Sequence, residues 1–231
     1  MLHWTKIAFA LVAPLFLASC VLQPGKFEST LTVNADRSFT FSYVGEVIAA
    51  DVKGGMMSGF SGKETGSTED VDKDPAEIEK ERQKKLAADQ KRESLAKLLA
   101  KEPGYRSVSY NGDDTFQIDY QISGNLDHHF LFPFNLDAEI LIPFLMVELR
   151  KDDRVRVKAP GFAVEQNASK MGPPNKGESK LDGVFTLVTD AEIVSQNNED
   201  GYKKSGGKKS ITWRVNPHTK DAPFAILQMT R

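Results

Sequence analysis

The sequence has little cysteine, no strong net charge and no apolar run long enough to cross a bilayer. Its single cysteine is Cys20, so the 231-residue chain can form no intrachain disulfide and no cysteine-based zinc site. With 30 basic and 32 acidic residues the formal net charge is -2, which gives no reason to expect nucleic acid as a partner. A composition of 40% hydrophobic and 27% charged residues indicates a globular protein with one core.

The motifs of common enzyme classes are missing as well. No G-x-S-x-G elbow of an exported serine hydrolase is present. His128 and His129 are adjacent, and on a strand they would point to opposite faces, so they cannot easily share a metal. The acidic pairs at 113–114, 152–153 and 199–200 fall in predicted turns, where aspartate commonly bonds the backbone. We therefore predict no catalytic residue, no metal and no cofactor, in a protein that is not an enzyme.

The first residues have the layout of an export signal. His3 and Lys6 precede an apolar stretch from Ile7 to Leu17 that only Pro14 interrupts. A helix of this length spans about 16 Å, which is too short for a hydrocarbon core of about 30 Å. A cleaved signal peptide over residues 1–19 is the better interpretation, and an unprocessed buried helix with an incidental cysteine is the alternative.

A cysteine preceded by small residues ends this segment. The quartet Leu17-Ala18-Ser19-Cys20 resembles the lipobox of bacterial lipoproteins, in which the signal is cut before the cysteine and the thiol is linked to diacylglycerol. The resemblance implies cleavage between Ser19 and Cys20, lipidation of Cys20, and a lipidated tether over residues 20–26. Two or three acyl chains, at about 0.8 kcal/mol per buried methylene, would hold the protein stably in a lipid bilayer.

The residue after the cysteine bears on the choice of membrane. An aspartate directly after the cysteine would resemble the inner-membrane retention signal of some bacteria with two membranes. This chain has Val21 at that position. The absence of that aspartate favours the outer membrane, facing the periplasm, over the inner membrane.

The mature chain begins with an alternating pattern and continues with a glycine-rich segment. Polar and apolar residues alternate from Phe27 to Val33 and from Phe39 to Val47, which predicts a hairpin with one buried face. Residues 53–73 contain glycine, serine, threonine and acidic residues with almost no apolar periodicity, and we predict a flexible loop there.

A long helix is predicted over residues 75–101. Asp74 is its N-cap, Pro75 takes the first helical position, and Pro103-Gly104 ends it. Large apolar residues are concentrated near its end, so the C-terminal half is expected to dock and the N-terminal half to project. A helix that meets a partner and a solvated helix on a sheet are both consistent with this pattern.

From Tyr105 onward the pattern is almost wholly that of strands. Asn111-Gly112-Asp113-Asp114 is a strong hairpin signal between two alternating runs. The apolar run from Phe130 to Val147 either lines a groove or forms core. We predict an α+β fold for residues 27–231: one domain with a mainly antiparallel sheet of about eight to ten strands, in one layer or in two as in a sandwich, and one long inserted helix.

The C-terminal half also resembles LppM-like envelope lipoprotein domains. The resemblance lies in the segment Gly183 to Asp190, the strand that carries Trp213 and a final apolar strand, beside the early hairpin at Leu31 to Asn34. It implies an α+β or sandwich-like domain with no established catalytic residues, for which lipid or amphiphile binding is one proposal.

Two sets of residues are candidates for contact with a membrane or a partner. Met56, Met57 and Phe60 lie in the glycine-rich loop, where such side chains also pack back on their own domain. Four lysines, which could meet anionic headgroups or simply keep a turn soluble, flank Ser205-Gly206-Gly207: Lys203, Lys204, Lys208 and Lys209.

The function predicted from the sequence is that of a membrane-anchored, non-enzymatic envelope lipoprotein that binds a protein partner or an amphiphile. A structural or assembly accessory of the envelope is the second hypothesis. An unrecognised hydrolase, using His218 or acidic groups, is the third.

Overall fold

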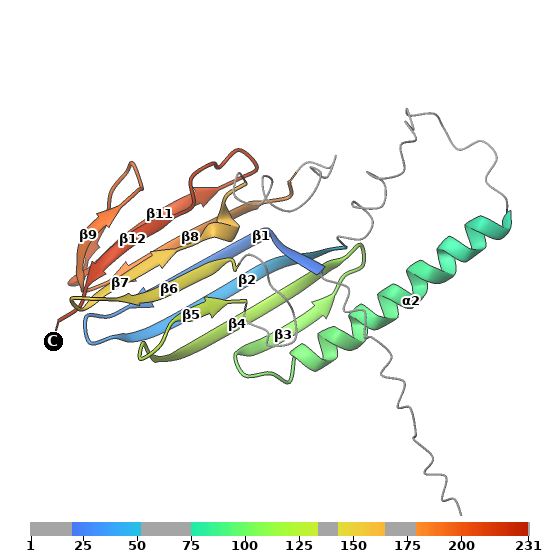
Figure 1. Ribbon diagram of the computed structural model, residues 1–231, viewed down its shortest axis with the longest axis horizontal. Coiled ribbons are helices and arrows are strands. Elements are labelled where there is room, and N and C mark those ends of the chain that lie inside the picture. Colours follow the sequence, from blue (N-terminus) through green and yellow to red (C-terminus); the bar gives the residue numbers. More distant parts are fainter. Residues whose placement is uncertain (1–19, 52–74, 134–142, 165–178, 231) are drawn as a thin grey trace, which may run out of the picture.

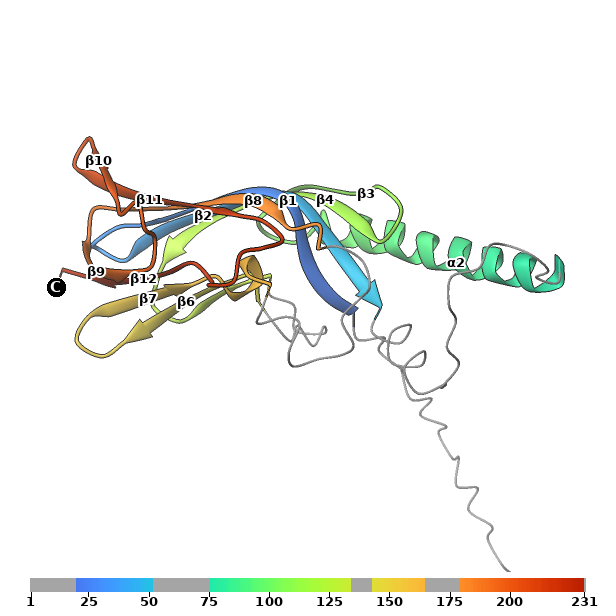
Figure 2. The same cartoon turned by 90° about the horizontal axis from the view of Figure 1, so that it is seen from above.

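The computed structural model describes residues 20–51, 75–133, 143–164 and 179–230, and in these ranges two sheets pack face to face (Figures 1 and 2). The seven-stranded sheet has the order β10-β11-β8-β1-β2-β4-β3. Its strands are β1 (Cys20–Val33), β2 (Ser38–Asp51), β3 (Tyr105–Tyr110), β4 (Thr115–Asn125), β8 (Asp182–Thr189), β10 (Lys203–Ser205) and β11 (Lys208–Val215).

The second sheet has five strands in the order β5-β6-β7-β12-β9. They are β5 (Phe130–Phe132), β6 (Leu145–Arg150), β7 (Arg154–Lys158), β9 (Glu192–Gln196) and β12 (Phe224–Gln228), with the short 3-10 helix η1 (Pro160–Phe162) after β7. Among the described strands only β1 and β8 pair in parallel. The predicted α+β, mainly antiparallel fold is confirmed in its two-layered form, with more strands than the eight to ten expected.

The first hairpin is longer than its sequence pattern predicted. Residues 20–26, expected to be a tether, are instead the first half of β1 and pair with β2 from Cys20 opposite Asp51. Gln23-Pro24-Gly25 breaks the polar–apolar alternation, which is why the sequence indicated a tether. Proline is accommodated because β8 pairs with β1 only from Lys26 onward, so Pro24 lies where that side of β1 has no described neighbour.

Aromatic rings fill the space between the two sheets. Phe27 stacks on Phe162 at 4.3 Å between centroids, and Phe162, Phe185 and Trp213 continue the row at 5.6 and 5.5 Å. On the other side of the core, four described residues of the run from Phe130 to Val147 are at most 2% exposed: Phe132, Phe144, Leu145 and Val147. The interpretation of this run as core is therefore right for these residues, and the groove interpretation is wrong for them.

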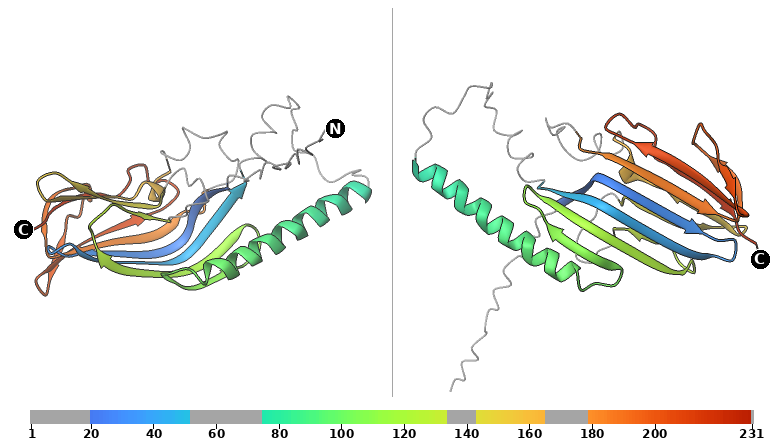
Figure 3. Two further views of the ribbon diagram at one scale, coloured as in Figure 1. Left: turned by 60° about the horizontal axis from the view of Figure 1, so that its bottom comes forward. Right: turned by 180° about the vertical axis from the view of Figure 1, so that it is seen from behind.

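One helix, α2 (Pro75–Leu99), joins β2 to β3 and lies beside β3 at the edge of the seven-stranded sheet (Figures 1 and 3). It begins at the predicted residue and ends two residues before the predicted Lys101. The last turn tightens there, because the Lys101 N–H bonds the Leu98 carbonyl at 3.0 Å instead of the carbonyl four residues back. Ala96 is the one buried residue of the helix, and its N-terminal half projects past the sheet as expected (Figure 3).

Candidate functional site

The start of β1 forms a two-stranded extension of the seven-stranded sheet. From Cys20 to Gln23 the described neighbour of β1 is β2 alone, since the pairing with β8 begins at Lys26. Figure 2 shows this end of the hairpin bending out of its sheet toward the side on which the five-stranded sheet lies. The first residues of β1 therefore lie on that side of the seven-stranded sheet (Figure 2).

A β-bulge between Pro24 and Phe27, opposite Gly45, produces the bend. Gly45 has φ +155°, and a Cβ atom there would lie 2.3 Å from the Lys26 carbonyl oxygen and 2.5 Å from the Phe27 Cα atom. Beside it, the buried Tyr43 hydroxyl donates to the Glu46 carbonyl at 2.7 Å. Only glycine allows the two strands to approach so closely, so the bend is a built feature of this hairpin.

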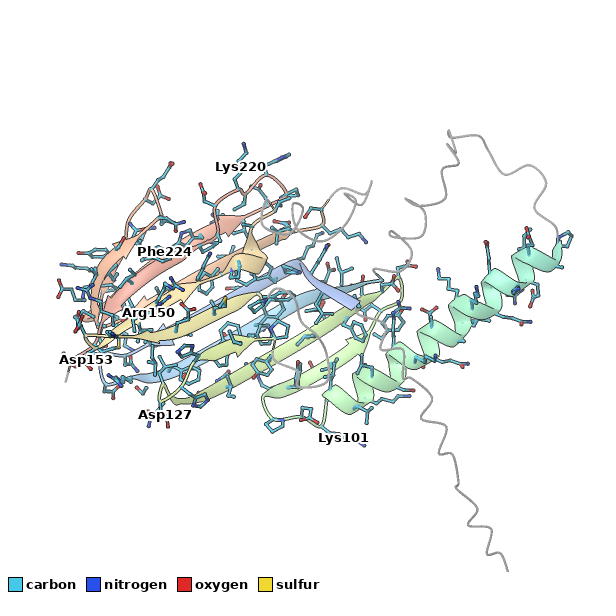
Figure 4. All side chains as sticks on the ribbon, viewed as in Figure 1. Lys101, Asp127, Arg150, Asp153, Lys220 and Phe224 are labelled. Carbon is cyan, nitrogen blue, oxygen red and sulfur yellow. The ribbon has the colours of Figure 1, made fainter. Side chains whose placement is uncertain are left out.

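The outward face of the five-stranded sheet carries most of its positive charge on two strands. In β7, Val155 and Val157 are fully buried, so alternation directs Arg154, Arg156 and Lys158 outward. Arg150 at the end of β6 lies opposite Arg154 and is labelled in Figure 4. We call the outward side chains of β6 and β7 the cationic face: Met146, Glu148, Arg150, Arg154, Arg156 and Lys158.

One carboxylate lies inside this face. Glu148 accepts hydrogen bonds from Arg156 and, at 3.1 Å, from Arg150. These bonds, with that from Arg156 first, lower the pKa of Glu148 below its ordinary value. Four cations against one ionised carboxylate leave the cationic face with three net positive charges. On β9, at the sheet edge, Glu192 is the other charged group of this sheet.

At one end the cationic face is crossed by a row of half-buried side chains, all apolar except Lys158. Leu131, Met146, Lys158 and Phe224 stand in register across β5, β6, β7 and β12. The Arg37–Asp153 ion pair, at 2.7 Å, fixes the β6–β7 turn beside the β1–β2 turn. The apolar row is therefore at the end of the face nearer to the start of β1, and the arginines lie farther from it.

The four lysines of the second predicted set lie at the opposite end of the molecule from Cys20. Lys209 is in register with Thr189, and Thr189 with Val33, the last residue of β1. A strand of 14 residues spans roughly 45 Å at about 3.3 Å per residue. Figure 2 shows this hairpin on the side of the seven-stranded sheet that faces away from the five-stranded sheet. The Lys209 ammonium donates to the Ala191 carbonyl at 2.8 Å, while the tip itself is exposed.

The helix is joined to the sheet through polar contacts. Three of them reach the end of β3 and the β3–β4 turn: Lys85 with Asp113 at 3.2 Å, Arg92 with Asp114 at 2.8 Å, and the Tyr110 hydroxyl donating to Asp89 at 2.5 Å. Burial, and then the bond to Asp89, raises the pKa of Tyr110. Large apolar side chains elsewhere on the helix are exposed, with Leu98 at 59%. Helix α2 is thus held against β3 and the β3–β4 turn by ion pairs and hydrogen bonds from its middle and C-terminal part.

The residues predicted to bind or react do not form a common site in the described ranges. Leu17, Ala18 and Ser19 of the lipobox, and Met56, Met57 and Phe60, lie outside the described residues. His128, His129 and His218 are exposed. No group of three metal-ligating residues is found within the described part of the chain. In the same part, no helix is long and apolar enough to cross a membrane.

Two of the acidic pairs that were predicted to lie in turns have the left-handed backbone of turn residues. Positive φ values of 45–61° occur at Asp113, Asp114, Asp152 and Asp153, in the two turns that the sequence predicted. The cationic face was missed, although its signal is visible in the sequence as three cations alternating with two valines from Arg154 to Lys158.

Comparisons with known proteins give distant similarities. No protein-family model and no curated protein sequence matches the chain. The folded domain of the Mycobacterium tuberculosis LppM protein, solved by NMR, is similar over 91% of this chain and 93% of that domain, with 15% identity and a TM-score of 0.33. An M1 zinc metallopeptidase from Deinococcus radiodurans is similar over 90% of this chain and 42% of its own length, with 9% identity and a TM-score of 0.30.

Proposed function

We propose that this chain is a lipid-anchored, non-catalytic binding protein of the bacterial cell envelope, held in a bilayer through acyl chains on Cys20. One observation carries the proposal: at Cys20 the chain is already a strand, paired with Asp51 of β2, and that strand continues through one bulge into the middle of the seven-stranded sheet. An anchor on this residue is joined to the domain by a paired strand, with no flexible tether between them. The domain would keep one orientation relative to the membrane.

The end far from Cys20 is where we place the partner. Its hairpin carries Lys203, Lys204, Lys208 and Lys209, which together present positive charge to an acidic protein surface. These lysines lie at the opposite end of β1 from Cys20, roughly 45 Å along the strand, so they are not the groups nearest to the anchor. The aromatic rings that fill the sandwich favour a protein partner over an amphiphile held between the sheets.

Labelling with a fatty acid, followed by fractionation, tests the anchor. The parent is expected to take up label and to follow the outer membrane, whereas Cys20→Ala should lose both the label and the membrane association. The matched control is Val21→Asp, which should keep the label and move to the inner membrane. A Cys20→Ala protein that stays labelled or membrane-bound would contradict the proposal.

A cross-linking experiment in cells tests the partner end. A photoreactive residue in place of Gly206 should give one discrete adduct with the partner. Gly206 is at the exposed tip of the lysine hairpin, and a side chain added there would have no atom of its own chain within 4 Å. The double charge reversal Lys204→Glu, Lys208→Glu should abolish the adduct, and Lys101→Glu, a control on another part of the surface, should leave it.

A further inference from the structure

We infer that the cationic face lies against the bilayer that holds Cys20, with Arg154, Arg156 and Lys158 over anionic phospholipid headgroups. The inference rests on the proposed function, because it takes an acylated Cys20 as its fixed point. It adds which surface of the domain meets the lipid and which surfaces are turned toward the periplasm.

The start of β1 is directed toward the side of the cationic face. The bulge at Pro24–Phe27 bends the start of β1 toward the side of the five-stranded sheet (Figure 2). Residues 20–23 are paired with β2, and at Gly45 the two strands lie too close for any side chain, so the bend is part of the paired hairpin. Acyl chains leaving from Cys20 would then draw the outward face of the five-stranded sheet toward the lipid, and not the outward face of the seven-stranded sheet.

The two broad faces of the sandwich differ in charge. The cationic face carries three net positive charges. The middle of the opposite face has no excess of positive charge: one row, in register from β11 to β4, consists of Thr212, Thr186, Thr30, Ser42 and Gln121, and the next row holds Arg214 with Glu28 and Asp119. The lysines of the β10–β11 hairpin are at the far end of that side, so near Cys20 the cationic face is the one complementary to a surface of anionic headgroups.

Apolar side chains and cations follow one another along the outward face of the five-stranded sheet. Leu131, Met146 and Phe224, half-buried and in register, form its end nearer to Cys20, where the acyl chains would enter the bilayer. The arginines follow, farther along. Apolar side chains with cations beside them are the composition by which peripheral proteins lie on a membrane surface.

Charge gives the expected strength. Each cation near an anionic membrane surface contributes about a fivefold preference, so three net charges favour the orientation with the cationic face down by roughly a hundredfold. The preference should disappear on zwitterionic lipid and at about 1 M salt, where the Debye length is about 3 Å. In this orientation the lysine hairpin faces away from the lipid, where the partner is proposed.

The test uses the full acylated protein in vesicles, and it exploits the absence of any cysteine other than Cys20. Once Cys20 is acylated, an added cysteine is the single free thiol for a fluorophore. Ser195→Cys places the probe on the outward face of β9, opposite Ile226 in the five-stranded sheet, and removes no charge. The matched control is Thr212→Cys, an exposed outward position on β11 of the other sheet.

In vesicles of phosphatidylcholine and phosphatidylglycerol, quenching by acrylamide in the water should be weaker at position 195 than at position 212. The difference should be lost in pure phosphatidylcholine and in the double variant Arg154→Gln, Lys158→Gln. Equal quenching at both sites, or stronger shielding at 212, would overturn the inference while the anchor stands. A protein that does not float with the vesicles would instead overturn the proposed function, and the orientation with it.

Discussion

Replacing Gly45 with alanine should destabilise the domain by about 3 kcal/mol, because the added methyl group meets backbone and not a side chain that can turn away. The new Cβ atom would lie 2.3 Å from the Lys26 carbonyl oxygen and 2.5 Å from the Phe27 Cα atom, well inside van der Waals contact. Overpacking of a rigid site costs about 1–3 kcal/mol, and a φ of +155° adds backbone strain for any residue other than glycine.

Relief of this clash would require β1 and β2 to separate at the bulge. The bend that directs Cys20 would then change together with stability. For a domain of this size, each kcal/mol lowers Tm by about 2–4 °C, so the expected loss is roughly 6–12 °C.

Trp213 provides the assay. It is one of two tryptophans in the sequence, and the other, Trp4, belongs to the predicted signal peptide, so the emission of the mature protein comes from Trp213 alone. Its indole N–H donates to Asn197 at 3.1 Å, and its ring stacks on Phe185, so unfolding should shift its emission. Gly124→Ala is the control: its Cβ would lie 3.4 Å from the Phe39 ring, an ordinary contact, and should change stability by less than about 1 kcal/mol. If Gly45→Ala unfolds together with this control, the close approach at the bulge is not rigid, and the argument for a fixed bend is wrong.

Two further changes probe the charged contacts. Because Arg156 and Arg150 lower the pKa of Glu148, its carboxylate adds stability above the pKa it has in the unfolded chain, and this contribution is lost as pH falls through its folded pKa. Glu148→Gln should therefore have a free energy of unfolding roughly 1–2 kcal/mol below that of the parent in urea titrations at pH 7. In acid the free energies of unfolding of the two proteins should become equal. A difference that persists in acid would contradict the ion-pair explanation. The double variant Arg92→Met, Tyr110→Phe should release helix α2 from the sheet without unfolding the two sheets. Trypsin should then cut faster after Lys84 or Lys85, while the Trp213 emission and the Tm stay near those of the parent. Unchanged cleavage would show that these contacts do not hold the helix.

The local structure of this chain could be predicted from its sequence to a large extent. Alternation over Phe27–Val33 and Phe39–Val47 indicated the first hairpin, and Asn111 to Asp114 indicated the second. The helix began where Asp74 and Pro75 predicted it, because N-cap and first-turn preferences act within a few residues. The extension of β1 to Cys20 was missed, since a bulge with proline and glycine has the composition of a linker.

Long-range pairing could not be predicted in the same way. The parallel pairing of β1 with β8 joins residues about 150 positions apart, and no local pattern specifies such a neighbour. The β6–β7 hairpin that carries the cationic face is itself local, with Arg150 opposite Arg154. That its charged side is turned outward beside β12 follows from the sheet order and from the burial of Val155 and Val157.

The position of β1 between β2 and β8 also has a mechanical consequence. A pull on Cys20 acts along β1 and loads in shear its hydrogen bonds to β2 and, from Lys26 onward, those to β8, so these bonds resist together and are not opened one after another. Under load, we expect the acyl chains to slip out of the lipid before the strand leaves its sheet.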